Sequence, residues 1–158
     1  MGERRWLDEE QQRAWRTFLT ATTLLFARID EDLKPFDLSG SEYAILVRLS
    51  ETPGRQLRMA QIADALCHSR SRVTHTIKRM EAKDLVRRVE SPDDGRGVVA
   101  VLTDKGAAKL EEAAPDHVET VRRHLIEHAS PEDIAALTRV MDAIADELGH
   151  THPETDLR

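Results

Sequence analysis

Apolar residues recur at intervals of three, four and seven positions in six segments of the chain, the spacing that gathers side chains on one face of an α-helix. The expected helices cover residues 11–33, 42–50, 59–66, 70–81, 105–129 and 131–148. Two shorter segments, 85–90 and 97–102, alternate or run apolar and predict the strands of a hairpin. The pattern therefore predicts a mainly α-helical protein with one small β-hairpin.

Capping residues stand before several of these segments and indicate where the helices begin. Ser39 and Ser41 are alternative N-caps for the second helix. Ser69 precedes the fourth helix, and Thr103 precedes the fifth. Asp84 stands where the chain must leave the fourth helix, and aspartate tolerates the left-handed conformation better than most residues.

Residues 59–103 read in order as a helix, a tight turn at 67–68, a second helix and the hairpin. The second of these helices carries basic and hydroxyl side chains on one face and aliphatic side chains on the other. The hairpin tip, residues 91–97, carries Arg96. This is the layout of a winged helix-turn-helix, whose second helix can lie in a DNA groove. We therefore expect a DNA-binding lobe at residues 36–103.

Positive charge is concentrated in this segment, although the chain as a whole carries a net charge of −6 at pH 7. Residues 55–96 carry ten basic and six acidic side chains, net +4. Residues 1–54 carry seven basic and ten acidic side chains, net −3, and residues 97–158 carry six and thirteen, net −7. A basic patch on an acidic body attracts phosphate at that surface only. The alternative is a set of ordinary solvated charges on a helix.

Length and composition favour one globular domain over residues 1–158. With 158 residues, of which 40% are hydrophobic and 33% charged, the chain can bury a core and is not expected to be disordered. No apolar run approaches the roughly 20 residues of a membrane span, and the charged N-terminus lacks the apolar segment of a secretory signal. The single cysteine, Cys67, excludes an intrachain disulfide and indicates a reducing cytoplasmic location.

The first, fifth and sixth helices, within residues 11–34 and 104–149, each carry an apolar stripe that a small lobe cannot cover. Two copies of the chain could bury these stripes against each other as a homodimer, leaving residues 150–158 as a loose tail. A two-fold dimer would place its recognition helices about one DNA turn apart, roughly 34–36 Å, and would read a pseudo-palindromic duplex site. The alternative is a monomeric bundle whose long helices fold back on their own core.

This order of elements resembles the MarR family of bacterial transcriptional regulators. The residues that look like the family's recognition helix and its exit are Ser69, Ser71, Val73, Thr74, Arg79, Met80, Glu81, Lys83, Asp84, Leu85, Val86 and Arg88. Those that look like its wing and the entry to its dimerisation helix are Asp94, Arg96, Gly97, Val101, Leu102, Thr103 and Gly106. The resemblance covers residues 11–148 and departs from the family at Asp84, where glycine is usual. It implies a winged helix-turn-helix with six helices and with dimerisation helices from both termini.

The resemblance and the helical geometry imply the same division of roles on DNA. Near base edges we expect Arg70, Arg72, Thr74 and His75. Near phosphates we expect Ser69, Ser71, Lys78 and Arg79. Arg96 at the wing tip would enter a minor groove, because narrow A·T-rich segments attract arginine. The alternative for each basic residue is a solvent-exposed helix charge.

Members of this family commonly bind small, often phenolic, anions between the dimerisation helices and the DNA-binding lobe, and repression is their commoner output. Four residues could line such a pocket here or simply belong to the core: Trp15, Phe18, Tyr43 and Leu46. Urate sensors of the family carry aspartate at the position of Ala44, so urate is not the expected ligand. The resemblance thus implies a repressor released by a small effector, with no enzyme activity, cofactor or metal.

Alternative functions rest on particular residues. His124, Glu127 and His128 match the H-x-x-E-H pattern of zinc peptidases, but a catalytic zinc needs a third protein ligand. Together with His117 they could instead serve a metal-sensing regulator. Cys67, expected to be half-buried in the turn, could make the regulator redox-responsive, although peroxide sensors of the family carry their cysteine in the first helix. The winged helix could also bind a protein partner rather than DNA.

Overall fold

The computed structural model describes residues 6–90 and 97–149 of the chain. Within these residues the α-helices are α1 (Glu9–Leu33), α2 (Gly40–Glu51), α3 (Met59–Ala65), α4 (Arg70–Ala82), α5 (Asp104–His124) and α6 (Pro131–Gly149). The strands are β1 (Gln56–Arg58), β2 (Val86–Glu90) and β3 (Val98–Leu102). Short 3-10 helices cover η1 (Lys34–Phe36), η2 (Pro53–Arg55) and η3 (Ile126–His128). The predicted mainly α-helical winged helix-turn-helix is confirmed.

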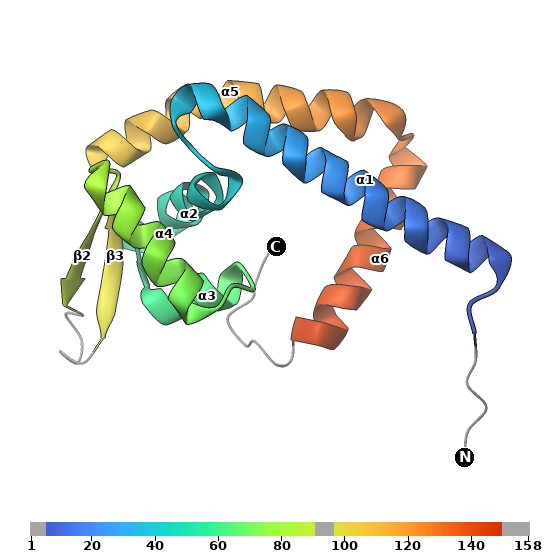
Figure 1. Cartoon of the computed structure of the whole chain (residues 1–158), viewed down its shortest axis with the longest axis horizontal. Helices are drawn as coiled ribbons and strands as arrows, with labels where there is room; N and C mark the ends of the chain where they lie inside the picture. The colour runs from blue at the N-terminus through green and yellow to red at the C-terminus, as the bar shows by residue number, and fades with distance from the viewer. Residues whose placement is uncertain (1–5, 91–96, 150–158) are drawn as a thin grey trace, which may run out of the picture.

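The molecule divides into a compact lobe and three long helices. The lobe holds α2, α3, α4 and the strands, and residues 91–96 of its hairpin tip lie outside the described part (Figure 1). The helices α1 and α5 run side by side along the lobe and beyond it, and α6 descends from the far end of α5 (Figure 1). We call α1, α5 and α6 the arms.

The core lies in the lobe, where the apolar stripes predicted from the sequence converge. Its fully buried side chains are Leu33, Ile45, Leu46, Leu49, Ile62, Val73, Ile77, Met80 and Val86. Leu33 reaches this core from the C-terminal end of α1, so one arm is anchored in the lobe. Burial of each large aliphatic side chain stabilises the fold by about 1.5–3 kcal/mol, so the lobe possesses a core of its own.

The sheet is antiparallel, with strand order β1-β3-β2. The predicted hairpin pairs Val86 with Leu102 and Glu90 with Val98. The prediction missed β1, which pairs Leu57 with Ala100. Three residues are too few to show an alternating pattern. In addition, β1 forms only by pairing with β3, which lies some 40 positions further along the chain.

Side-chain caps fix the ends of the helices. Ser39, not Ser41, caps α2: its hydroxyl accepts the Glu42 N–H at 3.2 Å, and the Glu42 carboxylate accepts the Ser39 N–H at 2.9 Å. The Thr103 hydroxyl accepts the Gly106 N–H in the first turn of α5 at 2.9 Å and donates to the Asp84 carbonyl at 2.7 Å. Asp84 has φ +60°, which confirms the predicted left-handed exit from α4.

The predicted end of the fifth helix is wrong. The helix α5 ends at His124 rather than near residue 129, because the backbone at Leu125 leaves helical geometry (φ −128°, ψ −59°) and continues as η3. Leu125 and Ile126 keep the apolar spacing across this break, so periodicity alone cannot locate it. Pro115 lies inside α5 without ending it.

The arms expose large apolar side chains along their length. The exposed fractions are highest at Phe26 (64%), Leu24 (65%) and Leu148 (64%), and Trp15, Val118, Val140 and Ile144 are also exposed. No helix in residues 6–90 and 97–149 combines the length and apolar character that a membrane crossing requires. Exposed apolar surface of this extent is the usual mark of an interface.

Candidate nucleic-acid interface

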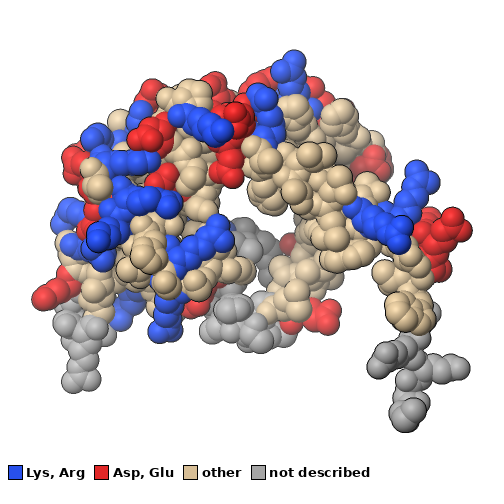
Figure 2. All heavy atoms as spheres, in the orientation of Figure 1, with Lys and Arg blue, Asp and Glu red and all other residues tan. Residues whose placement is uncertain are grey.

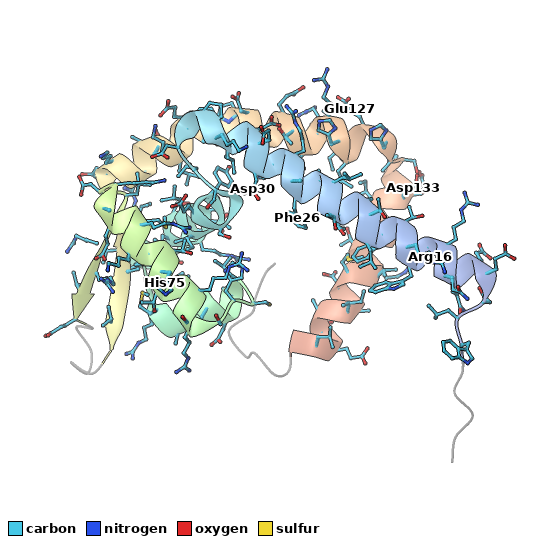
Figure 3. All side chains as sticks on the ribbon, in the orientation of Figure 1. Arg16, Phe26, Asp30, His75, Glu127 and Asp133 are labelled. Atoms are coloured by element: carbon cyan, nitrogen blue, oxygen red, sulfur yellow. The ribbon has the colours of Figure 1, made fainter. Side chains whose placement is uncertain are left out.

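The helix α4 separates its side chains into two faces. Its buried face consists of Val73, Thr76, Ile77 and Met80, which hold it to the lobe. Its exposed face carries the residues predicted for DNA: Arg70, Ser71, Arg72, Thr74, His75, Lys78 and Arg79, with the N-cap Ser69 also exposed. The structure therefore brings these predicted residues together. His75 stands on the outer side of α4 (Figure 3), and Lys and Arg side chains gather over this side of the lobe (Figure 2).

The guanidinium and ammonium groups of this face are largely unneutralised. Within the described part of the chain, Arg70 and Lys78 have no ion-pair partner, and Arg79 lies 3.6 Å from the Glu42 carboxylate. By contrast, Arg88 on the adjacent β2 donates to Glu81 at 2.8 Å. Cations without acidic neighbours keep their full charge available for phosphate oxygens.

The hydroxyl groups of Ser69 and Thr74 differ in the hydrogen bonds that they can still make. The Ser69 hydroxyl accepts the Arg72 N–H at 3.2 Å, so its own O–H remains free to donate to a phosphate. The Thr74 hydroxyl donates to the Arg70 carbonyl at 2.9 Å, so toward a base it can act as an acceptor or present its methyl group. The serine cap and the threonine therefore suit different contacts.

Two carboxylates fix the position of α4 in the lobe. Glu42 is buried (3% exposed), and its carboxylate lies 3.5 Å from the Lys83 ammonium at the end of α4. Glu81 of α4 binds the backbone N–H of Arg88 at 3.0 Å and so ties the helix to the hairpin. These contacts fix the orientation of α4 relative to the rest of the lobe.

The hairpin lies beside α4 and carries one basic residue that the sequence reasoning missed. Arg87 is exposed on β2, next to the buried Val86. Its place in the basic pair Arg87-Arg88 of the predicted strand is the sequence signal that could have identified it. Arg96, the predicted minor-groove contact, lies outside the described residues.

A second feature is a cleft of about 910 Å³ between the arms and the lobe. Its lining comes from α1, α2, α5 and the helix-turn-helix: Phe26, Ile29, Asp30, Gly40, Ser41, Tyr43, Ala44, Val47, Arg48, Glu51, Leu66, His68, Arg72 and His117. Phe26 and Asp30 mark the stretch of α1 that borders it (Figure 3), and Figure 2 shows a hollow between the lobe and the arms. A cavity of this volume can hold a drug-sized molecule.

The four predicted pocket residues do not lie together. Tyr43 lines the cleft, whereas Leu46 is fully buried in the core. Trp15 and Phe18 stack on each other at 6.0 Å between ring centroids, in the half of α1 that does not line the cleft. The missed cleft residues come from segments that only the fold brings together.

Two histidines of the cleft are held in neutral form. Burial lowers the pKa of His117, whose ring lies 4.4 Å from that of Tyr43 and whose buried Nδ1 has no hydrogen-bond partner. Burial, and then the charge of Arg72, lower the pKa of His68. Both imidazoles can therefore donate one hydrogen bond and accept another at neutral pH.

The two histidines of the H-x-x-E-H pattern do not lie on one continuous helix. His124 is the last residue of α5 and His128 the last of η3, so the backbone break at Leu125 removes them from a common helical face. In the part of the chain that the structure describes, no group of three His, Cys, Asp or Glu side chains is placed to hold a metal ion. Cys67, which adopts a φ of +50° in the turn, is exposed rather than half-buried as expected.

The chain is similar to known proteins both in sequence and in structure. Residues 36–97 match the model of the MarR family. The uncharacterized HTH-type transcriptional regulator YkoM of Bacillus subtilis is 32% identical, over 73% of this chain and 76% of that protein. The crystal structure of AbsC, a MarR family transcriptional regulator from Streptomyces coelicolor, is 44% identical with a TM-score of 0.87, covering 91% of this chain and 97% of that one. That of Sco3205, a MarR family transcriptional regulator from the same organism in complex with DNA, is 38% identical with a TM-score of 0.89, covering 94% and 93%.

Proposed function

Because the chain belongs to the MarR family of transcriptional regulators, we propose that it binds a pseudo-palindromic double-stranded DNA site as a homodimer and represses transcription until a small effector releases it. The exposed face of α4, with its unpaired cations, is the observation that carries this proposal. Sco3205, which shares the fold and 38% of its residues, has been solved in complex with DNA. This function requires no catalytic group or cofactor and belongs in the cytoplasm, where bacterial DNA is found.

We assign base contacts to the N-terminal half of α4 and phosphate contacts to its flanks. The base-contacting set is Arg70, Arg72, Thr74 and His75. The phosphate-contacting set is Ser69, Ser71, Lys78 and Arg79. Arg96 of the wing would contact a minor groove.

The exposed apolar surface of the arms supports the homodimer. The stripe that was predicted on each arm is solvent-exposed in a single chain, as at Trp15 (53%), Val118 (54%) and Ile144 (45%). A second copy related by two-fold symmetry would cover the same surfaces reciprocally. Pairing through the arms leaves the exposed face of α4 free on both subunits.

The cleft supports the effector. It lies between α1 and α5 of the arms and the helix-turn-helix of the lobe, so a bound molecule would contact both parts at once. A ligand that binds one arrangement of arms and lobe more tightly than another shifts the population toward it. We propose that this shift lowers the affinity of the dimer for DNA.

The proposal is tested by selecting a bound duplex from a random-sequence pool and titrating it by fluorescence anisotropy at several salt concentrations. Wild-type affinity should fall steeply as salt rises, and Lys78→Met should reduce the slope of log K against log salt by about 1, because one phosphate contact is lost. Arg139→Met, an exposed cation of α6, is the matched control and should leave the slope unchanged. Failure to bind any duplex at low salt would refute DNA binding and favour a protein-interaction module.

A further inference from the structure

The two carboxylate oxygens of Glu42 on α2 have different surroundings. The Oε2 atom accepts the Ser39 N–H at 2.9 Å and the Ser39 hydroxyl at 3.1 Å, so it completes the capping box that begins α2. The Oε1 atom is buried and accepts no hydrogen bond from the residues that the structure describes. The cap therefore accounts for one oxygen of this buried carboxylate and leaves the other without a role in it.

The second oxygen of Glu42 faces α4, which packs against α2 (Figure 1). The Oε1 atom lies 3.6 Å from Nε of Arg79 and 3.5 Å from Nζ of Lys83. Lys83 is held in place by further acceptors, because its ammonium also lies 3.5 Å from Oε2 and donates to the Asp37 carbonyl. Among the described residues, Glu42 is the one acidic neighbour of Arg79. The carboxylate thus lies between an anchored lysine and an arginine that has no other carboxylate to pair with.

The guanidinium of Arg79 can bind two anions at once. Its side chain is 60% exposed, and the described residues supply no acceptor for its two Nη groups. The five N–H groups of a guanidinium have a fixed planar arrangement, so an acceptor at Nε leaves the Nη groups free for a second anion and restricts the direction in which they point. The distance of 3.6 Å between Nε and Oε1 is only slightly longer than a hydrogen bond. A small movement of the Arg79 side chain would therefore satisfy the buried oxygen and orient the guanidinium.

We propose that Glu42 is a positioning residue for DNA binding: its Oε1 atom accepts the Nε–H of Arg79 and directs the Nη groups of that arginine toward a DNA phosphate. This inference rests on the proposed function and on the assignment of Arg79 to a phosphate contact. It gives an acidic side chain a favourable role next to a DNA surface, where its charge alone would repel phosphate. Removal of the charge should therefore change DNA affinity in opposite directions according to which of the two effects is larger.

The test variant is Glu42→Gln in the full-length protein, titrated with the selected duplex by fluorescence anisotropy. The amide oxygen of glutamine can still accept the Ser39 N–H, so the cap remains while the negative charge beside Arg79 is lost. This variant should bind DNA at least about fivefold more weakly than the wild type, because the charge-assisted hydrogen bond that orients Arg79 is removed. Glu51→Gln, which removes a negative charge from an exposed site on the same helix, is the matched control and should bind DNA at least as tightly as the wild type. The melting temperature of each variant checks its folding.

A double-mutant cycle with Arg79→Lys separates positioning of Arg79 from a general effect on the fold. Lysine keeps a positive charge for the phosphate but has no Nε–H for Glu42 to hold. In the Arg79→Lys background, Glu42→Gln should therefore cost less than about twofold in DNA affinity. Ser39→Ala removes the hydroxyl of the cap and leaves the carboxylate in place, so it should lower the melting temperature and keep the wild-type DNA affinity.

Two results would overturn the role of Glu42 while leaving DNA binding established. Unchanged or tighter DNA binding by Glu42→Gln would mean that the carboxylate does not aid Arg79 or that it competes with phosphate for this arginine. An equal loss of affinity in the wild-type and Arg79→Lys backgrounds would mean that Glu42 acts on α4 as a whole, through Lys83. A wild-type protein that binds no duplex at low salt would refute the proposed function itself, and the role of Glu42 would fail with it.

Discussion

The lobe and the arms treat their apolar side chains in opposite ways. In the lobe Ile45, Leu46 and Ile77 are completely buried, whereas Phe26 and Leu148 on the arms are each 64% exposed. The sequence patterns of the two parts are alike, since both show helical apolar stripes. The apolar side chains of a lobe helix are buried by other residues of the same chain, whereas those of an arm can be buried only by a surface outside the chain. The same periodicity thus encodes a core in one part and an interface in the other.

The two parts also differ in how they treat cations. On the arms Arg28 pairs with Asp32, Lys34 with Glu31 and Lys109 with Glu112. On α4 in the lobe, Arg70, Arg72 and Lys78 have no acidic partner among the described residues. Pairs on an exposed helix contribute little to stability, but they cancel charge. The exposed face of α4 therefore keeps its positive charge, whereas each of these three pairs cancels a positive charge on or next to the arms.

The largest expected effect is a loss of stability from a cavity in the lobe. Ile77→Ala removes a fully buried side chain of α4, so the free energy of unfolding should fall by about 2–5 kcal/mol. Urea unfolding at a fixed protein concentration measures this change, because the stability of a dimer depends on concentration. Thr74→Ala, on the exposed face of the same helix, is the control and should cost less than about 1 kcal/mol. A loss of less than about 1 kcal/mol in Ile77→Ala as well would mean that the lobe lacks a core of its own.

A charge on the arms should separate the subunits while leaving each chain folded. Ile144→Glu places a carboxylate on the apolar stripe of α6, and the dissociation constant of the dimer should rise at least about 30-fold, or about 2 kcal/mol. Sedimentation velocity over a concentration series measures the shift. Arg139→Glu introduces the same group on the opposite face of α6 and should leave the dimer intact. A dimer that tolerates Ile144→Glu would mean that this stripe of α6 lies outside the interface, and a wild-type chain that sediments as a monomer would favour the monomeric bundle.

Local patterns of the sequence predicted the elements well and their meeting points poorly. Helical stripes, N-caps such as Ser69 and the left-handed position at Asp84 are encoded within a few residues, so they can be read directly. The strand β1 depends on pairing with β3 and was missed, and the break at Leu125, across which the apolar spacing continues, was misplaced. Periodicity reports that a side chain is apolar on one face, but not what that face meets.

The two candidate sites, the exposed face of α4 and the cleft, also differ in how much of each the sequence could predict. The exposed face of α4 lies on one helix, and its residues could be named from spacing alone. The cleft draws on Phe26, Arg72 and His117, which lie on three helices and span some 90 positions of the chain. Nothing near His117 in the sequence distinguishes it from the exposed histidines that follow it. Only the fold places its ring against Tyr43.

His117 marks the junction of the two parts, and the smallest expected effect concerns its titration. Burial lowers the pKa of His117 below its usual 6.5, so the unfolded chain takes up this proton before the folded one does. The contribution of His117 to stability is therefore complete above about pH 6.5 and is lost as the pH falls toward its folded pKa. His117→Phe keeps an aromatic ring against Tyr43 and removes the proton, so the difference in stability between pH 7.5 and pH 5.5 should shrink.

The measurement compares each protein with itself at the two pH values, so a general gain in stability from the added phenylalanine does not affect it. The pKa of Asp32 is lowered by the hydrogen bond from Thr120, so this carboxylate stays charged throughout and contributes no slope. His68, whose pKa is lowered in the same direction, maintains part of the slope in the variant. His128→Phe, at an exposed site on η3, is the matched control and should keep the wild-type difference. An unchanged difference in His117→Phe would mean that this imidazole is as free to accept a proton as one on the surface, and that the junction between arms and lobe is open to water.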